Sequence, residues 1–493
     1  MTGARLQRST PLPAGLEGYP VDPEQVGIVH LGIGAFHRTH QAYFTELAVR
    51  ATGDRHWGVL GVTQRSAAVR DQLRPQGGVY SVMTLAPQGT SLDVVGSVLD
   101  VAHPGDETGR VLAAMAAPTT HVVTLTVTEK GYSRLPDGGL DLAQVGADLE
   151  ALSAEERGEE PEGTRPARSA VGLLVRGLAA RRRAAAGQPR PLTVLTCDNM
   201  ADNGHVLAGL VRTALDVALP GTARALHDWL DAHVAFPCSM VDRIAPVTTP
   251  AQRDAAERLL GARDEGLVVA EPFRQWVIED RFAGPRPAWE VAGATFTAAV
   301  APYERAKLRL LNGTHSLVAY TGLLAGHATI AEAVADPEIL TWARRLVRDD
   351  AVPTLVPPDG LDLEAYGEQI LARFANPHIG HTTAQVATDG TQKIPQRWGP
   401  VAAARLARGV VPQAVARGLA AWAVHVTRTV RAGGDLADPR EPELRAVVDA
   451  AAHEGEDAVV RRLLTLPGLL PDGAGADERL AQAVVEHARG LRD

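Results

Sequence analysis

The segment YERAKLRLLNGTHS, residues 303 to 316, contains the side-chain types that acid–base chemistry at an oxygen atom requires. At about 100° per residue, a helix places four of them within an arc of about 140°: Glu304, Lys307, Asn312 and His315. Interconversion of an alcohol and a carbonyl by hydride transfer needs a proton carrier and neutral donors that stabilise an alkoxide. Lys307 is the candidate acid/base and Asn312 the candidate donor. His315 would orient the substrate, and Glu304 would relay protons to solvent.

The alternative for this segment is a solvated helix with an ion pair between Glu304 and Lys307 at i,i+3. The scarcity of lysine favours the catalytic interpretation. The chain has 49 Lys and Arg residues, of which three are lysines and 46 (49 − 3) are arginines. Arginine stays protonated, whereas a desolvated lysine can release its proton. Where drift in an AT-poor genome removes lysine, the three that remain mark candidate functional positions, namely Lys130, Lys307 and Lys393.

A second scarce asparagine, Asn199, follows the apolar run 192–197 in LTVLTCDNMADNGHVL. The carboxyl end of a strand in an open α/β sheet is where ligands bind, so Asn199 is expected to pair with Asn312 as an alkoxide donor, one from each domain. The alternative is a helix N-cap formed by Asp198, Asn199 or Asp202.

Two further segments contain candidate substrate contacts. In HTTAQVATDGTQKIPQR, residues 381 to 397, Lys393 could hold a carboxylate or hydroxyl, although a turn at Asp389 explains part of the composition. In FPCSMVDRIAP, Asp242 stands beside Arg243, a pair that is more often a buried ion pair than a substrate contact.

A glycine-rich turn begins the candidate nucleotide site. GIVHLGIG, residues 27 to 34, is typical of a buried strand that ends in Gly32 and Gly34, and a helical pattern follows from Ala35 and Phe36. The third small residue of such a motif is replaced by His37. A dinucleotide turn and a strand that merely ends in a tight turn remain the two interpretations.

The ribose-reading carboxylate expected about 20 residues later is absent from GVTQRS, residues 61 to 66. Gln64, Arg65 and Ser66 can bond ribose hydroxyls, and Arg65 can meet a 2′-phosphate. The choice between NAD and NADP therefore stays open.

Apolar strand patterns alternate with helical ones in the first part of the chain, at 27–34, 57–63, 79–85, 121–128 and 192–197. This order predicts a parallel, doubly wound, Rossmann-like sheet in an α/β domain spanning residues 1–300. The segment 151–168 is expected to be an exposed loop. A mostly helical domain is expected over 301–493, with helical stretches at 303–325, 328–350, 402–431 and 476–491.

Composition excludes several classes of protein. A net charge of −9 and a pI near 6.0 argue against nucleic-acid binding, and the basic run 181–183 is expected to be a solvated helix face. Neither an apolar run of membrane-spanning length nor a secretory signal is found, which predicts a cytoplasmic protein. Cys197 and Cys238 lack metal-ligand spacing, so both are expected to be reduced and buried, and no metal is expected.

Several motifs together resemble the polyol-specific long-chain dehydrogenases, the mannitol dehydrogenase and fructuronate reductase family. They run in order from about residue 27 to 397: GIGAFHRTHQA, TVTEKGY, TCDNMADNGH, SMVDRIAP, EPFRQWVIED, KLRLLNGTHS and DGTQKIPQR. The resemblance implies zinc-independent, NAD(P)-linked oxidation of a sugar alcohol or sugar acid. It also implies the roles given above for Lys307, Asn199, Asn312, His315 and Glu304.

Within this family, HTTAQVATDGTQKIPQR is similar to the fructuronate reductase (mannonate oxidoreductase) branch, since mannitol-oxidising members have an arginine near Gln385. The resemblance implies substrate contacts from Asp242, Lys393, Gln385 and Arg397. Cofactor contacts are expected from Gly32, Gly34, Ala35, Phe36, Arg65 and Glu129.

We therefore expect an NAD-dependent mannonate oxidoreductase, with NADP not excluded because the acid that NAD-preferring members place near Ala67 is missing. A mannitol or arabinitol dehydrogenase is the alternative substrate assignment, and a nucleotide sensor without catalysis is the alternative class. The expected state is a monomer or weak oligomer.

Overall fold

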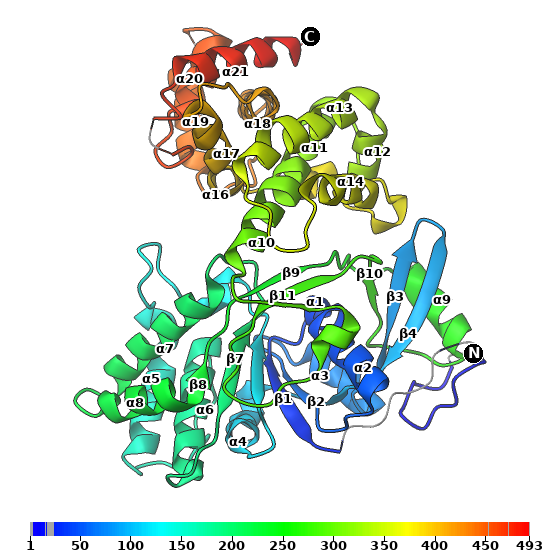
Figure 1. The fold of residues 1–493 in the computed structure, drawn as a ribbon, viewed down its shortest axis with the longest axis vertical. Coiled ribbons are helices and arrows are strands. Elements are labelled where there is room, and N and C mark those ends of the chain that lie inside the picture. The colour runs from blue at the N-terminus through cyan, green and yellow to red at the C-terminus, as the bar shows by residue number, and fades with distance from the viewer. Residues whose placement is uncertain (1–2, 15, 17–23, 452, 472, 493) are drawn as a thin grey trace. The chain divides into compact units, whose positions relative to one another are not determined.

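The computed structural model describes residues 3–14, 16, 24–451, 453–471 and 473–492 (Figure 1). The chain divides into two compact units, Met1–Val300 and Ala301–Asp493. We call them the sheet unit and the helical unit, and describe each by itself.

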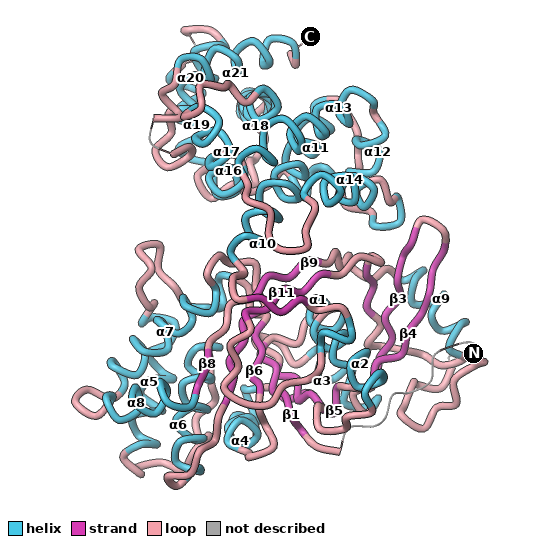
Figure 2. Tube along the Cα trace, in the orientation of Figure 1, coloured by secondary structure: helices cyan, strands magenta, loops and turns pink. Residues whose placement is uncertain are grey.

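The sheet unit is built on six parallel strands in the order β5-β2-β1-β6-β7-β8 (Figure 2). Their bounds are β1 Val26–Leu31, β2 Gly58–Val62, β5 Val98–Ala102, β6 Val122–Leu125, β7 Leu192–Thr196 and β8 Val234–Ala235. The inner strands β1, β2, β6 and β7 are apolar and almost fully buried because helices cover both faces, as expected for a parallel sheet. The predicted α/β fold class, with a doubly wound amino-terminal domain, is confirmed.

Helices alternate with these strands: α1 Ala35–Thr39, α2 Gln41–Thr52, α3 Ala68–Leu73, α4 Pro104–Ala116, α5 Leu142–Glu156, α6 Ala170–Ala185, α7 Asn203–Ala218, α8 Ala223–His233 and α9 Pro250–Leu260. One apolar core joins one sheet face to α4, α5, α6, α7 and α8, and a second joins the other face to α2 and α3. The predicted loop at 151–168 is wrong in its first part, since α5 continues to Glu156.

The strand predicted at 79–85 lies outside the main sheet. It is β3 (Tyr80–Ala86), which pairs with β4 (Gly89–Val95) in an antiparallel hairpin and with β10 (Val268–Ala270) in parallel. A connection of two residues between β3 and β4 can only join antiparallel strands, which explains the separate sheet. A third sheet contains β12 (Thr295–Thr297), β11 (Gln275–Glu279) and β9 (Ser239–Asp242).

The expected solvated face at residues 181–183 is also partly wrong. Arg181 is 1% exposed, and its guanidinium donates to five backbone carbonyls: those of Met115, Ala117, Thr120, Arg190 and Pro191. The planar group with five donors fits this ring of carbonyls, which a lysine could not satisfy. Arg181 therefore fastens α6 to the segments before β6 and β7.

In the described residues of the helical unit, all regular secondary structure is helical, apart from one isolated β-bridge between Thr329 and Thr382. The α-helices are α10 Ala301–Ala306, α11 Gly313–Leu324, α12 Ile330–Ala335, α13 Pro337–Arg345, α14 Leu363–Phe374, α15 Thr383–Val386, α16 Gly390–Arg397, α17 Gly399–Leu406, α18 Gln413–Arg431, α19 Glu441–Ala450, α20 Glu456–Leu464 and α21 Glu478–Gly490. The central α18 packs against α11 and α21. Among the described residues, no helix combines the length and the apolarity needed to cross a membrane. The mostly helical carboxy-terminal fold is confirmed.

Two π-helical turns interrupt the long helices predicted in this unit. Lys307–Asn312 joins α10 to α11, and Leu346–Ala351 follows α13. The two π turns contact one another. The uniform 3.6-residue period assumed for 303–325 and 328–350 is therefore wrong at these turns, which close hydrogen bonds from i to i+5. Similarly, the stretch 402–431 is broken into α17 and α18 before Gln413.

Candidate functional site

Gly32 forms the turn at the carboxyl end of β1. Its φ of +99° lies in the region that favours glycine, and a Cβ there would stand 2.1 Å from the carbonyl oxygen of Thr126. The backbone N–H of Gly34 then donates to the carbonyl of Gly32 (2.7 Å), and Gly34 is the N-cap of α1. The strand, glycine turn and helix predicted from the sequence are present. Gly32 lets the turn pack closely against Thr126, and the space beside Gly34 is open, which would let a pyrophosphate approach the backbone there.

His37, which replaces the third small residue, packs against β1 in a different way. Its ring stacks on that of His30 at a centroid distance of 3.3 Å and an interplanar angle of 12°. The His30 ring also contacts the hydroxyls of Thr124 and Thr126, at 2.7 and 2.9 Å. Two flat rings in contact therefore allow the helix to approach the strand closely, a role usually given to a small side chain.

This stack predicts a loss of stability in mild acid. Burial lowers the pKa of His30 to about 3 and that of His37 well below its usual value. Between about pH 6.5 and 3 the unfolded chain binds a proton that folded His30 does not, so acidification favours unfolding. From pH 7 to 5 this costs about 2 kcal/mol for His30. Urea titrations at pH 7 and pH 5 should show that the wild type loses about 2 kcal/mol more unfolding free energy than His30→Gln, because glutamine does not titrate. An equal loss in both proteins would contradict the assignment.

A pocket of about 190 Å³ lies at the carboxyl edge of the sheet, beside the glycine turn. Leu31 from the end of β1, Val62 from the end of β2, Gln64 and Arg65 are among its lining residues. Arg65 is exposed, and the buried Nε2 atom of Gln64 has no hydrogen-bond partner. The pocket therefore lies where a Rossmann-like domain reads the adenosine ribose.

The remaining expected cofactor residues surround this edge. Ala35 is exposed and Phe36 is half-buried at the start of α1, where the Phe36 ring stacks on His40 at 5.0 Å. Glu129 is exposed in the 3₁₀ turn Glu129–Tyr132, directly after Thr128, whose φ is +64°. Glu129 is not among the residues that line the pocket, whereas its neighbour Lys130 is.

Asp198 joins the loops that follow β6 and β7. Its carboxylate accepts from the backbone N–H groups of Val127 and Thr128, at 2.9 and 2.8 Å, and from the Tyr132 hydroxyl at 2.8 Å. Burial raises the pKa of Asp198, and these three donors lower it. The loop that carries Asn199 is therefore held at the carboxyl edge of the sheet, where the sequence placed it.

Asn199 itself is exposed, next to this buried carboxylate. The N-cap of α7 is Asp202, with a φ of +55° and without a side-chain capping bond, so the capping alternative for Asn199 is wrong. The structural asparagine of the motif is Asn203, whose side chain donates to the carbonyl of Ser239 (2.7 Å) and accepts from its N–H (3.0 Å).

Asp242 ends β9 and is 6% exposed. Its neighbour Arg243 donates to the backbone carbonyls of Glu271 (3.0 Å) and Thr39 and lies 5.0 Å from the centre of the Tyr43 ring. The arginine therefore has a backbone-anchoring role of its own beside Asp242.

The structure also brings together a group that sequence spacing did not reveal. The carboxylate of Asp202 lies 2.5 Å from the Nδ1 atom of His205 and 3.5 Å from the sulfur of Cys238. Hydrogen bonds among the three account for the arrangement without an ion. Both cysteines are free and buried, as expected.

In the helical unit, Lys307 begins the π turn and is 7% exposed, which contradicts a solvated surface helix. Asn312 ends the turn, and its buried Oδ1 atom has no hydrogen-bond partner. His315 follows in α11, and its buried Nε2 atom also lacks a partner. A half-buried Glu304 precedes them in α10. One continuous helical run therefore carries a buried amine and two side chains with unused polar atoms, which is the arrangement a polar ligand would complete.

His315 lies between two rings and is influenced by three cationic side chains. Its ring stacks on His381 at 5.8 Å and on Phe374 at 4.6 Å. Burial lowers the pKa of His315 well below its usual value, and the His381 ring and the charges of Arg397, Lys393 and Arg373 lower it further. Burial also lowers the pKa of His381. His315 is therefore neutral at pH 7 and acts as a hydrogen-bonding group rather than a charge.

Arg397 and Lys393 were predicted from the sequence as substrate contacts, and the structure shows their hydrogen-bond partners. Arg397 donates to the Ser316 hydroxyl (2.6 Å) and to the Asn312 carbonyl (3.2 Å), and burial lowers its pKa to about 10. Lys393 donates to the Thr388 hydroxyl (3.0 Å) and lies 3.7 Å from Asp389. Burial and the charge of Arg397 lower the pKa of Lys393.

Arg373, in α14, was missed by the sequence analysis because a lone arginine in an ordinary amphipathic helix carries no local signal. Gln385 is exposed, and its side chain closes a capping box by accepting from the N–H of Thr382 (3.2 Å). A structural contribution of Gln385 is therefore evident, and its expected substrate contact stays a prediction.

Each of the two units matches a domain model of the same protein family. Residues 26–291 match the model of the mannitol dehydrogenase Rossmann domain, and residues 299–486 match that of the mannitol dehydrogenase C-terminal domain. The D-mannonate oxidoreductase of Escherichia coli is 39% identical over 90% of this chain and 89% of its own. A D-arabinitol 4-dehydrogenase of Ralstonia nicotianae is 39% identical over 79% of this chain and 80% of its own.

Solved structures give the same result. A ternary complex of Pseudomonas fluorescens mannitol 2-dehydrogenase with NAD and D-mannitol has a TM-score of 0.80 at 32% identity, covering 99% of this chain and 97% of its own. A substrate-free D-sorbitol dehydrogenase has a TM-score of 0.85 at 28% identity, covering 99% and 98%. With both units matched in order and relatives well above 30% identity over most of their length, the chain is an oxidoreductase that belongs to the mannitol dehydrogenase family.

Proposed function

We propose that this protein interconverts D-mannonate and D-fructuronate with NAD as the hydride carrier. The observation that carries the proposal is a set of three cations near the neutral His315. Arg397 bonds to Ser316 and to the backbone carbonyl of Asn312, and Lys393 lies one turn before Arg397 in α16. Arg373 precedes Phe374, whose ring stacks on His315. A carboxylate on the substrate is the natural partner of such a set, because guanidinium and ammonium groups form charge-assisted hydrogen bonds with it. Asp389 and Asp438 offset part of the charge of Lys393.

The chain's own residues divide the remaining tasks. Lys307 takes the proton from the substrate hydroxyl during oxidation and returns it during reduction, and Glu304 passes that proton towards solvent. Asn312 and Asn199 each donate an N–H to the oxygen as negative charge develops there. His315, neutral at pH 7, holds a neighbouring hydroxyl through its unpartnered Nε2 atom. Asp242 is assigned to substrate binding.

The dinucleotide would be held by the sheet unit. The edge formed by Gly34, Ala35 and Phe36, where the space beside Gly34 is open, fits a pyrophosphate. Arg65 and Glu129 would lie towards the adenosine ribose. When bound, the nicotinamide ring accepts the hydride from the carbinol carbon or supplies it to the carbonyl.

A polyol substrate is the second candidate. It is favoured by the similarity to a structure that contains D-mannitol and by the arabinitol dehydrogenase among the relatives. Both substrates would use the same acid/base and alkoxide donors, and they differ in whether the cations meet a carboxylate.

A substrate panel tests this choice. We expect kcat/KM for D-mannonate to exceed those for mannitol and arabinitol by at least about a hundredfold, since losing a bidentate charged contact costs roughly 2 to 3 kcal/mol. D-altronate serves as a stereochemical control. Lys393→Met should lower kcat/KM for mannonate far more than for mannitol. A hundredfold preference of the wild type for an uncharged polyol would assign the protein to the second candidate.

A further inference from the structure

The pocket beside Arg65 has a lining that contains positive groups and no carboxylate. Arg65 follows β2, Lys130 follows β6, and Arg168 precedes α6, and all three are exposed at the pocket. Polar uncharged groups complete the wall, among them Gln64 and Ser133. Three segments far apart in the sequence thus present cations to one cavity, which marks it as a place for an anion.

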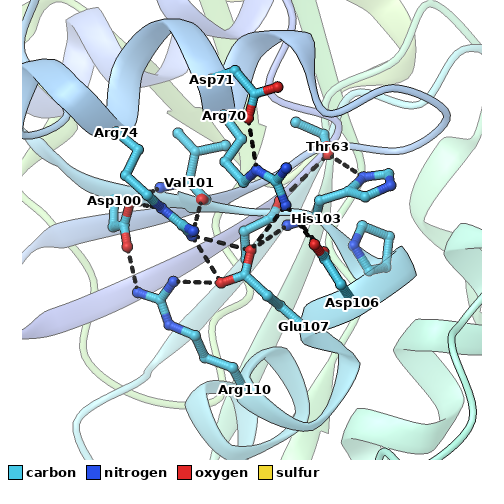
Figure 3. Close-up of polar contacts among 12 residues, drawn as sticks. Thr63, Arg70, Asp71, Arg74, Asp100, Val101, His103, Asp106, Glu107 and Arg110 are labelled. Carbon is cyan, nitrogen blue, oxygen red and sulfur yellow. Dashed lines mark hydrogen bonds and ion pairs between the residues drawn. The ribbon is translucent and has the colours of Figure 1, made fainter.

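Several carboxylates near this wall are already paired, and Glu129, which precedes Lys130, is exposed and does not line the pocket. Figure 3 shows the cluster formed by α3, β5 and the start of α4, next to the pocket residue Thr63. Asp71 and Asp106 accept from Arg70, at 3.0 and 2.8 Å, and Asp100 and Glu107 accept from Arg74 and Arg110. Hydrogen bonds from the arginines and from the backbone of His103 hold the pKa of Glu107 at about 2. Among the described residues, these acids are committed to arginines rather than directed at the pocket.

Lys130 strengthens the argument because lysine is so rare in this chain. Of the three lysines, Lys307 and Lys393 belong to the proposed substrate site, and Lys130 has no part in it. The positive φ of Thr128 and the bonds from Val127 and Thr128 to Asp198 fix the backbone immediately before it. Lys130 therefore follows a backbone segment that hydrogen bonds hold in place, and it lines the pocket.

The position of the pocket identifies the anion. A Rossmann-like domain reads the adenosine ribose at the end of its second strand, where NAD-selective proteins place an acid that accepts from the 2′-hydroxyl. Here that position carries Gln64 and Arg65, and an arginine there accommodates a 2′-phosphate. We propose that this pocket binds the 2′-phosphate of NADP, so that the protein accepts NADP(H) at least as well as NAD(H). This inference rests on the proposed dinucleotide-dependent function and adds the cofactor specificity of the same site.

Equilibrium binding of adenosine fragments tests the proposal without catalysis. Isothermal titration calorimetry compares adenosine 2′,5′-bisphosphate with 5′-AMP, which differ only in the 2′-phosphate. We expect the bisphosphate to bind at least tenfold more tightly at low salt, with the difference shrinking as salt is raised. Fluorescence titrations should give a Kd for NADPH equal to or below that for NADH.

Variants locate the effect. Arg65→Ala should reduce the advantage of the bisphosphate to less than threefold and change 5′-AMP binding little. Arg65→Asp supplies the missing acid and should make NADH the tighter ligand. Arg224→Ala is the matched control, because Arg224 is a 92% exposed side chain on α8 and its loss changes the net charge equally. Arg224→Ala should leave both affinities unchanged.

The outcomes separate the two proposals. Equal or weaker binding of the bisphosphate by a wild type that binds NADH and oxidises mannonate would overturn the 2′-phosphate site alone. Failure of both NADH and NADPH to bind would overturn the proposed function, and the cofactor specificity with it. An equal loss in Arg65→Ala and Arg224→Ala would reduce the effect to net charge and overturn the assignment to Arg65.

Discussion

Lys307→Arg is expected to fold normally and to lose about 10²- to 10⁴-fold in turnover, the usual contribution of a positioned acid/base group. Guanidinium keeps its proton at every pH at which the protein is folded, so the variant retains the positive charge and lacks the base. The low exposure of Lys307 in the π turn means that water cannot easily replace the amine. In the wild type, the rate of oxidation should rise with pH as the neutral amine becomes available.

Arg309→Lys provides the control for Lys307→Arg. It is the reciprocal exchange on the same π turn, where Arg309 donates to the carbonyl and hydroxyl of Thr354. We expect a lower melting temperature for this variant and near-normal turnover. If Lys307→Arg kept more than a tenth of the wild-type rate at saturating substrate, Lys307 would not be the base.

Asn312→Ala and Asn199→Ala are each expected to lower kcat by about a hundredfold to a thousandfold, the usual effect of removing one oxyanion donor. Because these donors act on charge that develops in the transition state, the Kd for the dinucleotide should change little. Asn312→Asp keeps the shape but replaces the donor by an acceptor, so it should be at least as inactive as the alanine variant. Steady-state kinetics and dinucleotide titrations on the same preparations measure both effects.

Asn203→Ala distinguishes a structural asparagine from a catalytic one. Its amide bonds to Ser239 and to the carbonyl of Asp198 are buried, so its removal should cost about 1 to 3 kcal/mol of stability. Asn199 is exposed, and its alanine variant should melt at nearly the wild-type temperature. A destabilised but fully active Asn199→Ala protein would remove Asn199 from the catalytic set.

The sheet could be predicted from the sequence because its strands are continuous apolar runs, and a parallel sheet buried on both faces requires such runs. The same signal misplaced β3. This hairpin strand is buried in a further apolar core that it forms with β4, β10 and α9, so its composition is similar to that of a strand of the main sheet. Arg181 shows a related limit. A run of three arginines is normally solvated, and only the fold reveals that one of them is buried and donates to five backbone carbonyls.

The candidate site was predictable where rare residue types marked it and unpredictable where geometry decides. Lys307, Asn312 and Asn199 stood out because lysine and asparagine are scarce in this chain. The missed features are Arg373, one of 46 arginines, and the meeting of Arg65, Lys130 and Arg168 at one pocket. Contacts between residues that are far apart in the sequence cannot be predicted from the spacing of residues within one segment.

The π turn at Lys307–Asn312 makes the helical part of the site depend on the number of residues as well as on their kinds. An i to i+5 turn holds one residue more than the regular helix requires. A regular α-helix would turn by about 500° over the five steps from Lys307 to Asn312, which places the two residues about 140° apart around the axis. Conversion of this turn to ordinary α-helix at unchanged length would rotate Asn312 and His315 by about 100° relative to Lys307. Every functional side chain would still be present in such a protein, but its amine and its amide would face different directions.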